Sequence, residues 1–160
     1  MYCLTAVFLL ASLAEIGSVK LPKLLVVGID GMRYDYLSKE RTPNMWTLAN
    51  MGSKTSFGLK PQTPTVSGTN WYTIATGLNA ESHGIIANIF PDLTTGEVFD
   101  YKGVLDDGKY SESSRDPKWY SGEPIWQTND NHGSGRRSAA VEFTHASARI
   151  NGKTIGKFVE

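Results

Sequence analysis

The chain has 160 residues and a mass of 17.6 kDa, with 40% hydrophobic and 20% charged residues. These proportions are those of a globular protein with room for one modest domain, and they argue against intrinsic disorder and a coiled coil. The 16 Lys and Arg residues balance the 16 Asp and Glu residues. Because there is no excess positive charge, the composition excludes binding of polynucleotides or anionic membranes through bulk charge.

The N-terminal stretch is predicted to be a secretory signal peptide over residues 1–18. Residues 4–14 are almost entirely apolar, but they are too few for the roughly 20 residues of a membrane span. Ala14 is the candidate cleavage point, since small residues precede such sites. A buried N-terminal helix or strand is the alternative, because no Lys or Arg precedes the apolar run. Cleavage would remove Cys3, the only cysteine, so the mature chain would need a packed core or a metal for stability.

Residues 24–29 (LLVVGI) are the first element that the pattern predicts after the leader. The run is too short for a helix and too apolar for a half-exposed strand, so we expect a strand buried on both faces. It ends at Asp30-Gly31, a typical turn pair.

Capping and stop signals predict the elements that follow. Thr42 offers an N-cap before Pro43, which suits a first helical position, and Gly52 is a stop. By the same reasoning, the pattern predicts helices over 43–51, from Ser67 to Gly77 and from Glu123 to Gly133, strands over 55–59 and 138–143, and a polar surface loop over 106–116. Alternating strands and helices indicate an α/β domain with a mainly parallel sheet, whose chemistry gathers at the carboxyl ends of strands.

Asp30 is the first candidate for chemistry, because it directly follows the predicted buried strand. A carboxylate at that edge of a parallel sheet could bind a metal ion such as zinc, magnesium or calcium. The alternative is a carboxylate that caps its own Asp-Gly turn.

Ser67 is the second candidate, at the expected start of a helix. A hydroxyl there faces unpaired N–H groups and the positive end of the helix dipole, a setting that favours phosphate binding and attack on phosphorus. The alternative is an ordinary N-cap, for which Ser is among the commonest residues. Thr65 and Thr69 share the same ambiguity.

The histidines provide no local metal or triad motif. His83, His132 and His145 are the only three, and none lies at metal-ligand spacing from another His or Cys. His83 is interpreted as a turn or helix-end residue. The tryptophans are interpreted as packing residues rather than a base-stacking platform.

Five segments resemble the ectonucleotide pyrophosphatase/phosphodiesterase family of the alkaline phosphatase superfamily. They are residues 24–37 (LLVVGIDGMRYDYL), 42–44 (TPN), 64–86 with its block 76–86 (TGLNAESHGII), 122–128 (GEPIWQT) and 150–152 (ING). The resemblance implies an alkaline-phosphatase-like three-layer α/β/α fold with a mainly parallel sheet. Residues 19–160 would then be the N-terminal part of the catalytic domain, so the sheet is expected to be incomplete in this chain.

The resemblance also implies roles for single residues. Ser67 stands where the family has its threonine or serine nucleophile, which also contacts metal, and Asp30 stands at a metal ligand. Asn88 stands at the asparagine that contacts the non-bridging phosphate oxygens. The implied cofactors are two zinc ions, the implied course is a covalent phospho-enzyme, and the implied substrate is a nucleotide or another small phosphate ester. The implied location is outside the cell, secreted or at the cell surface, with no membrane anchor expected in this chain.

The sequence departs from the family pattern in three places. Residues 67–72 read SGTNWY where the family usually has Thr-Phe-Pro-Asn-His-Tyr, and residues 141–145 read VEFTH in place of an aromatic-Trp-Pro-Gly stretch. The family's Asp-x-x-x-His and Asp-His ligands do not occur before Glu160. Two alternatives therefore stand beside the phosphodiesterase: a non-catalytic truncated homologue, and a phosphomonoesterase or phospholipid head-group hydrolase. A sulfatase is excluded, because that branch needs a Cys-x-Pro-x-Arg motif.

Overall fold

The computed structural model of the chain describes residues 22–101 and 112–159. The predicted signal peptide over 1–18, with its candidate cleavage point at Ala14, lies outside the described residues. Within them, no helix has the length and apolar character needed to cross a membrane.

The helices begin and end close to where the capping signals predict. The described α-helices are α1 (Pro43–Met51), α2 (Ser67–Thr76), α3 (Ala80–His83) and α4 (Ile125–Asn131), with 3-10 helices at Tyr34–Tyr36, Glu112–Arg115 and Pro117–Trp119. Gly77 ends α2 with a φ of +71°, and its N–H donates to the Thr73 carbonyl. Glycine suits this left-handed C-cap because it has no Cβ.

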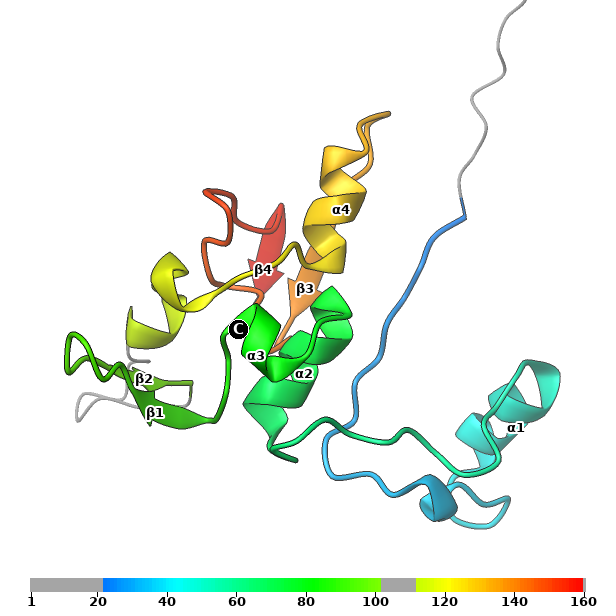
Figure 1. Cartoon of the computed structure of the whole chain (residues 1–160). Coiled ribbons are helices and arrows are strands. Elements are labelled where there is room, and N and C mark those ends of the chain that lie inside the picture. Colours follow the sequence, from blue (N-terminus) through cyan, green and yellow to red (C-terminus); the bar gives the residue numbers. More distant parts are fainter. Residues whose placement is uncertain (1–21, 102–111, 160) are drawn as a thin grey trace, which may run out of the picture.

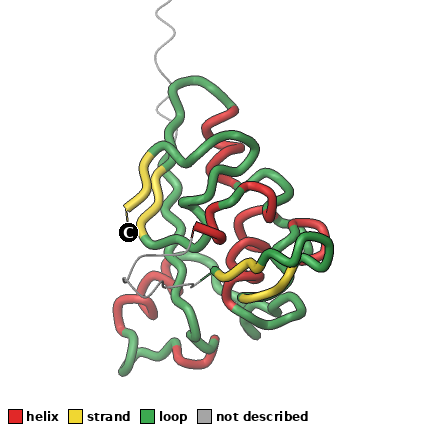
Figure 2. Tube along the Cα trace, turned by 90° about the vertical axis from the view of Figure 1, so that its left-hand side faces the viewer, coloured by secondary structure: helices red, strands yellow, loops and turns green. Residues whose placement is uncertain are grey.

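Short strands form two separate pairs within the described residues. β1 (Ile89–Pro91) pairs antiparallel with β2 (Val98–Asp100). β3 (Ala139–Val141) pairs parallel with β4 (Lys157–Val159) and confirms the predicted strand over 138–143. The result is a mixed α/β arrangement in which the two strand pairs lie apart from one another and α4 runs beside β3 (Figure 1). Loops join most of these short helices and strands (Figure 2).

The predicted strands over 24–29 and 55–59 are wrong for this structure. Neither segment pairs with a strand among the described residues. Their apolar side chains are exposed, with Leu25 at 83% and Phe57 at 80%. A strand needs a neighbour to satisfy its backbone N–H and C=O groups, so the apolar pattern alone does not produce one here.

Aromatic side chains form the core around α2. Tyr72 is fully buried and meets the rings of His83, Tyr120 and His145 edge-on, with centroids 5.1, 5.2 and 5.6 Å away. The core also includes Ile85, Phe99, Trp119, Trp126 and Ile150. Trp119 and Trp126, two of the four tryptophans, are thus confirmed as core residues. By contrast, α1 has no buried residue and stands apart from the other elements (Figure 1).

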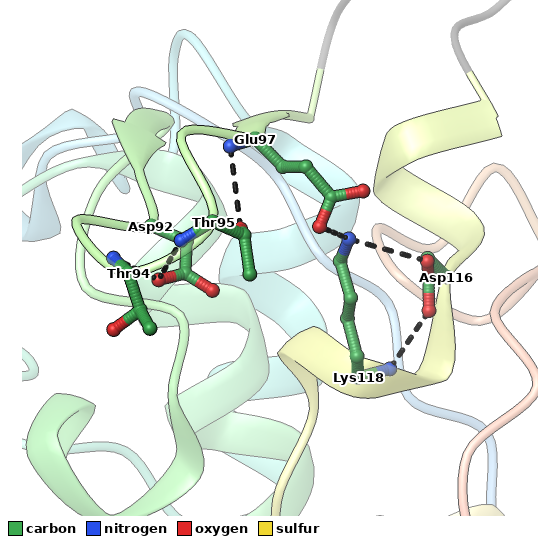
Figure 3. A network of polar contacts seen from close by, with 6 residues as sticks. All are labelled: Asp92, Thr94, Thr95, Glu97, Asp116 and Lys118. Atoms are coloured by element: carbon green, nitrogen blue, oxygen red, sulfur yellow. Dashed lines mark hydrogen bonds and ion pairs between the residues drawn. The ribbon is translucent and has the colours of Figure 1, made fainter.

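A polar network joins the β1–β2 turn to the 3-10 helix Pro117–Trp119 (Figure 3). The Lys118 ammonium pairs with the carboxylates of Glu97 and Asp116. The hydrogen bond from Lys118 holds the pKa of Glu97 below its usual value. The hydrogen bond from the backbone N–H of Thr94 likewise holds the pKa of Asp92 below its usual value. Because these groups are exposed, the network fixes the local geometry of the hairpin more than it stabilises the fold.

Candidate active site

Ser67 and Asp30 meet at the start of α2. The Ser67 hydroxyl donates to the Asp30 carboxylate, with Oγ 3.0 Å from Oδ2 and 3.3 Å from Oδ1. Ser67 is the first residue of α2 and Val66 is the N-cap, without a side-chain cap. The ordinary N-cap interpretation of Ser67 is therefore wrong, and its hydroxyl points instead to a carboxylate 37 residues away.

The carboxylate of Asp30 caps its own turn, as one of the two interpretations predicts, and it also contacts Ser67. Its Oδ1 accepts the backbone N–H of Gly31 at 3.1 Å, as an Asp-Gly turn would, and Gly31 has a φ of +68°. The same carboxylate also accepts the Ser67 hydroxyl. The turn fixes the carboxylate, and the fixed carboxylate orients the hydroxyl.

A tight contact explains how the exposed segment 24–29 brings Asp30 to α2. The ring of Trp71, on α2, packs directly on the backbone of Gly28, where an added Cβ would lie 2.5 Å from a ring carbon. Only glycine leaves room for this approach. The indole thus supports the residues that immediately precede Asp30.

Asn88 lies on the other side of the same helix start. Its Oδ1 accepts the backbone N–H of Gly68 at 2.9 Å. Gly68 is buried, and a Cβ there would lie 2.9 Å from the same oxygen, so glycine is required for the contact. Ser67, Asp30 and Asn88 are therefore brought together at the N-terminus of α2, although they come from three separate segments.

Asn70 is a site residue that the sequence did not single out. Its Oδ1 accepts the Gln62 backbone N–H at 2.8 Å, and its Nδ2 donates to the carbonyls of Pro64 and Val66 at 3.0 Å each. These bonds tie the loop before Ser67 to the helix that follows it. The relevant signal was a side-chain amide three residues into a predicted helix after a proline-rich loop.

His83 is confirmed as a helix-end residue. It closes α3 and is fully buried. Its Nδ1 accepts the Ile85 N–H at 3.1 Å, which leaves Nε2 to donate to the Thr73 hydroxyl at 2.9 Å. Burial lowers the pKa of His83 below its ordinary value.

His145 is a second residue that sequence reasoning missed as part of this region. Its Nε2 lies 2.9 Å from the carbonyl oxygen of Gly68, and its Nδ1 lies 3.0 Å from the Tyr120 hydroxyl. The side chain is buried, and burial lowers the pKa of His145 to about 4. No local spacing could have revealed a contact across 77 residues.

A cleft of about 700 Å³ opens beside Asp30. Its lining includes the backbone segment around Gly28, the rings of Trp71 and Tyr101, and the charged side chains of Arg115 and Glu142. The cleft is large enough for a small organic ligand with a charged group.

Comparison with known proteins places this arrangement in a family. The model of the type I phosphodiesterase / nucleotide pyrophosphatase family matches residues 24–157. The chain is 41% identical over 104 residues to an uncharacterized pyrophosphatase/phosphodiesterase of Schizosaccharomyces pombe, covering 64% of this chain and 20% of that protein. It is 36% identical over 140 residues to the bis(5'-adenosyl)-triphosphatase enpp4 of Mus musculus, covering 86% of this chain and 28% of that protein.

Solved structures agree. Murine ectonucleotide pyrophosphatase/phosphodiesterase 5, in an inactive threonine-to-alanine variant bound to AMP, superposes with a TM-score of 0.67 at 28% identity. The match covers 82% of this chain and 33% of that one, and it confirms the alkaline-phosphatase-like α/β fold class. This chain thus spans between about a fifth and a third of the length of these relatives. It belongs to the type I phosphodiesterase / nucleotide pyrophosphatase family.

Proposed function

We propose that this chain carries the nucleophile and part of the phosphate site of a hydrolase that cleaves phosphodiester or pyrophosphate bonds in nucleotides. The observation that carries the proposal is the 3.0 Å hydrogen bond from the Ser67 hydroxyl to Asp30 at the start of α2. A hydroxyl in that position has helix N–H groups beside it and a carboxylate that receives its proton. Asn88 is placed next to the same helix start through its bond to Gly68.

The proposed reaction has two displacements at phosphorus. In the first, Ser67 Oγ forms a bond to phosphorus while the P–O bond to the leaving group breaks, and the hydroxyl proton passes through Asp30 to the leaving oxygen. In the second, water attacks phosphorus, the Ser67 Oγ–P bond breaks, and Ser67 regains its proton. The Asn88 amide and the positive end of α2 offset the negative charge on the non-bridging oxygens.

The names of the relatives support a nucleotide as the substrate. One is a bis(5'-adenosyl)-triphosphatase, and a structural neighbour holds AMP. Venom phosphodiesterases, such as that of Crotalus adamanteus at 33% identity, are also relatives, and they support a location outside the cell for this chain.

The two zinc ions that the family resemblance implies do not fit the described residues alone. Asp30 and Ser67 supply one carboxylate and one hydroxyl, and the described part of the chain has no group of three His, Cys, Asp or Glu that could hold a metal ion. A catalytic zinc ion normally takes three protein ligands. The proposed reaction therefore contains no step on zinc.

This shortage of ligands favours a second candidate, a non-catalytic homologue that binds its ligand without hydrolysing it. Calorimetric titration of the 160-residue chain with zinc can contradict this second candidate. A dissociation constant in the micromolar range or tighter would count against it.

Turnover of a chromogenic phosphodiester, p-nitrophenyl thymidine 5'-monophosphate, tests the proposed activity. We expect Ser67→Ala to reduce kcat by roughly ten-thousand-fold, because the group that attacks phosphorus is gone. Ser67→Thr is the matched control, since it keeps a hydroxyl at the same carbon, and it should stay within about tenfold of the original chain.

Three outcomes bear on the alternatives. Undiminished turnover after Ser67→Ala would overturn the proposal, and a wild-type chain without turnover would favour the non-catalytic homologue. Faster hydrolysis of p-nitrophenyl phosphate than of the diester would instead identify a phosphomonoesterase.

A further inference from the structure

Gly68, the residue that follows the proposed nucleophile, is held at both its N–H and its carbonyl. The N–H of Gly68 donates to Asn88 Oδ1, and the carbonyl of Gly68 faces His145 Nε2, each at 2.9 Å. The two partners come from segments 20 and 77 residues away along the chain. Gly68 is thus clamped by side chains from outside its own helix.

The hydrogen-bond chemistry assigns the proton on His145. A carbonyl oxygen only accepts, so Nε2 must carry the hydrogen that is donated to Gly68. In the neutral ring Nδ1 is then an acceptor, and the Tyr120 hydroxyl at 3.0 Å is its donor. That hydroxyl also donates to the Ser114 carbonyl, so its single proton is shared between that carbonyl oxygen and Nδ1.

The backbone of His145 adopts a conformation that is costly for a residue with a Cβ. Its φ is +69°, in the left-handed region that favours glycine. The residue is nevertheless only 7% exposed, and its ring packs against Tyr72, Phe99 and Tyr101. A histidine in this conformation needs compensating contacts, and the bonds to Gly68 and Tyr120 are the polar ones.

We propose that His145 is a positioning residue that fixes the Gly68 peptide, and through it the direction of the Ser67 hydroxyl. This inference rests on the proposed function for its catalytic meaning, although the clamp itself can be tested without any activity. His145 acts through Gly68 and does not itself touch the substrate. It keeps the first turn of α2 aligned with Asp30 and Asn88.

Three variants separate the hydrogen bond from the packing. His145→Gln keeps an N–H near the position of Nε2, His145→Asn has a side chain too short to reach Gly68, and His145→Gly relieves the backbone strain. We expect amide hydrogen exchange at Gly68 to rise about tenfold in the Asn and Gly variants, because losing one ordinary hydrogen bond at the Gly68 carbonyl makes opening of the first turn of α2 easier by about that factor. The Gln variant should stay within about twofold. The amide of Gly77, at the other end of the same helix, is the internal reference and should not change.

Equal exchange at Gly68 in all variants, or a parallel rise at Gly68 and Gly77, would overturn the proposal. Nitrogen-15 spectra of the wild-type imidazole give a readout that does not depend on any variant folding. They should show a proton on Nε2 and none on Nδ1 at pH 7, and the opposite tautomer would contradict the clamp. If the wild-type chain turns over the chromogenic diester, kcat should follow the Gly68 exchange while KM stays constant. A chain without turnover would favour the non-catalytic homologue, and the exchange measurement would still test the role of His145.

Discussion

Lowering the pH from 7 to 4 is expected to destabilise the folded chain by roughly 3 kcal/mol through His145 alone. Burial lowers the pKa of His145 from 6.5 to about 4. Below pH 6.5 the unfolded chain takes up a proton at this ring while the folded chain does not. The stability contributed by the neutral ring is therefore fully present above pH 6.5 and is lost as the pH falls toward 4.

Other titrating groups act beside His145 and must be separated from it. Burial lowers the pKa of His83 as well, so His83 adds to the loss in the same direction. Asp92 and Glu97 also have lowered pKa values, but their contribution is lost only as the pH falls below the ordinary carboxyl range. Tyrosine rings are neutral throughout this pH range, and burial moves the pKa of Tyr72 and Tyr120 further above it.

Urea unfolding at pH 7.0, 5.5 and 4.5 measures this effect. The wild-type chain should lose stability steadily over the range, and His145→Gln should lose less, because glutamine does not titrate. Curves that fall in parallel for the two chains would show that His145 is not the group responsible.

Two single hydroxyl deletions in the core should have opposite effects on the free energy of unfolding. The Tyr72 hydroxyl is buried and has no hydrogen-bond partner among the described residues. Removing it by Tyr72→Phe should leave stability unchanged or raise it by about 1 kcal/mol, because an unsatisfied buried group is eliminated. The Tyr120 hydroxyl bonds to His145 and Ser114, so Tyr120→Phe should cost about 1–3 kcal/mol.

Truncation of the same ring sets the scale for the core. Tyr72→Ala removes the ring at the centre of the aromatic cluster and should cost about 3–5 kcal/mol. Thermal and urea unfolding of the three variants against wild type give the comparison. Equal losses for Tyr72→Phe and Tyr120→Phe would mean that the hydroxyl of Tyr72 does have a partner in solution.

Local signals in the sequence were sufficient for α1, α2 and α4, but of the strands they located only β3. Pro43 and Gly52 bound α1 where predicted, and Gly77 ends α2, because caps and stops act within a few residues. The run 24–29 has a strand pattern and forms none, since strand formation depends on a neighbour elsewhere in the chain. The apolar pattern of this run predicts burial, but its aliphatic side chains are exposed, because no described segment packs over them.

The candidate site, too, could be predicted from the sequence only in part. Residue type and position made Ser67 and Asp30 candidates, but only the fold brings their side chains to hydrogen-bond distance. The assignment of Asn88 came from family resemblance, and the structure places it against the residue after Ser67. His145 had no signal, because its role depends on a contact with a backbone carbonyl 77 residues away.

The most direct test of the account is to identify the residue that becomes covalently attached to phosphorus. The chain is mixed with p-nitrophenyl thymidine 5'-monophosphate, quenched in acid, digested and analysed by mass spectrometry. We expect a thymidine monophosphate adduct on Ser67, absent from Ser67→Ala and present in Ser67→Thr. An adduct on Thr65 or Thr69, or an undiminished adduct in Ser67→Ala, would contradict it.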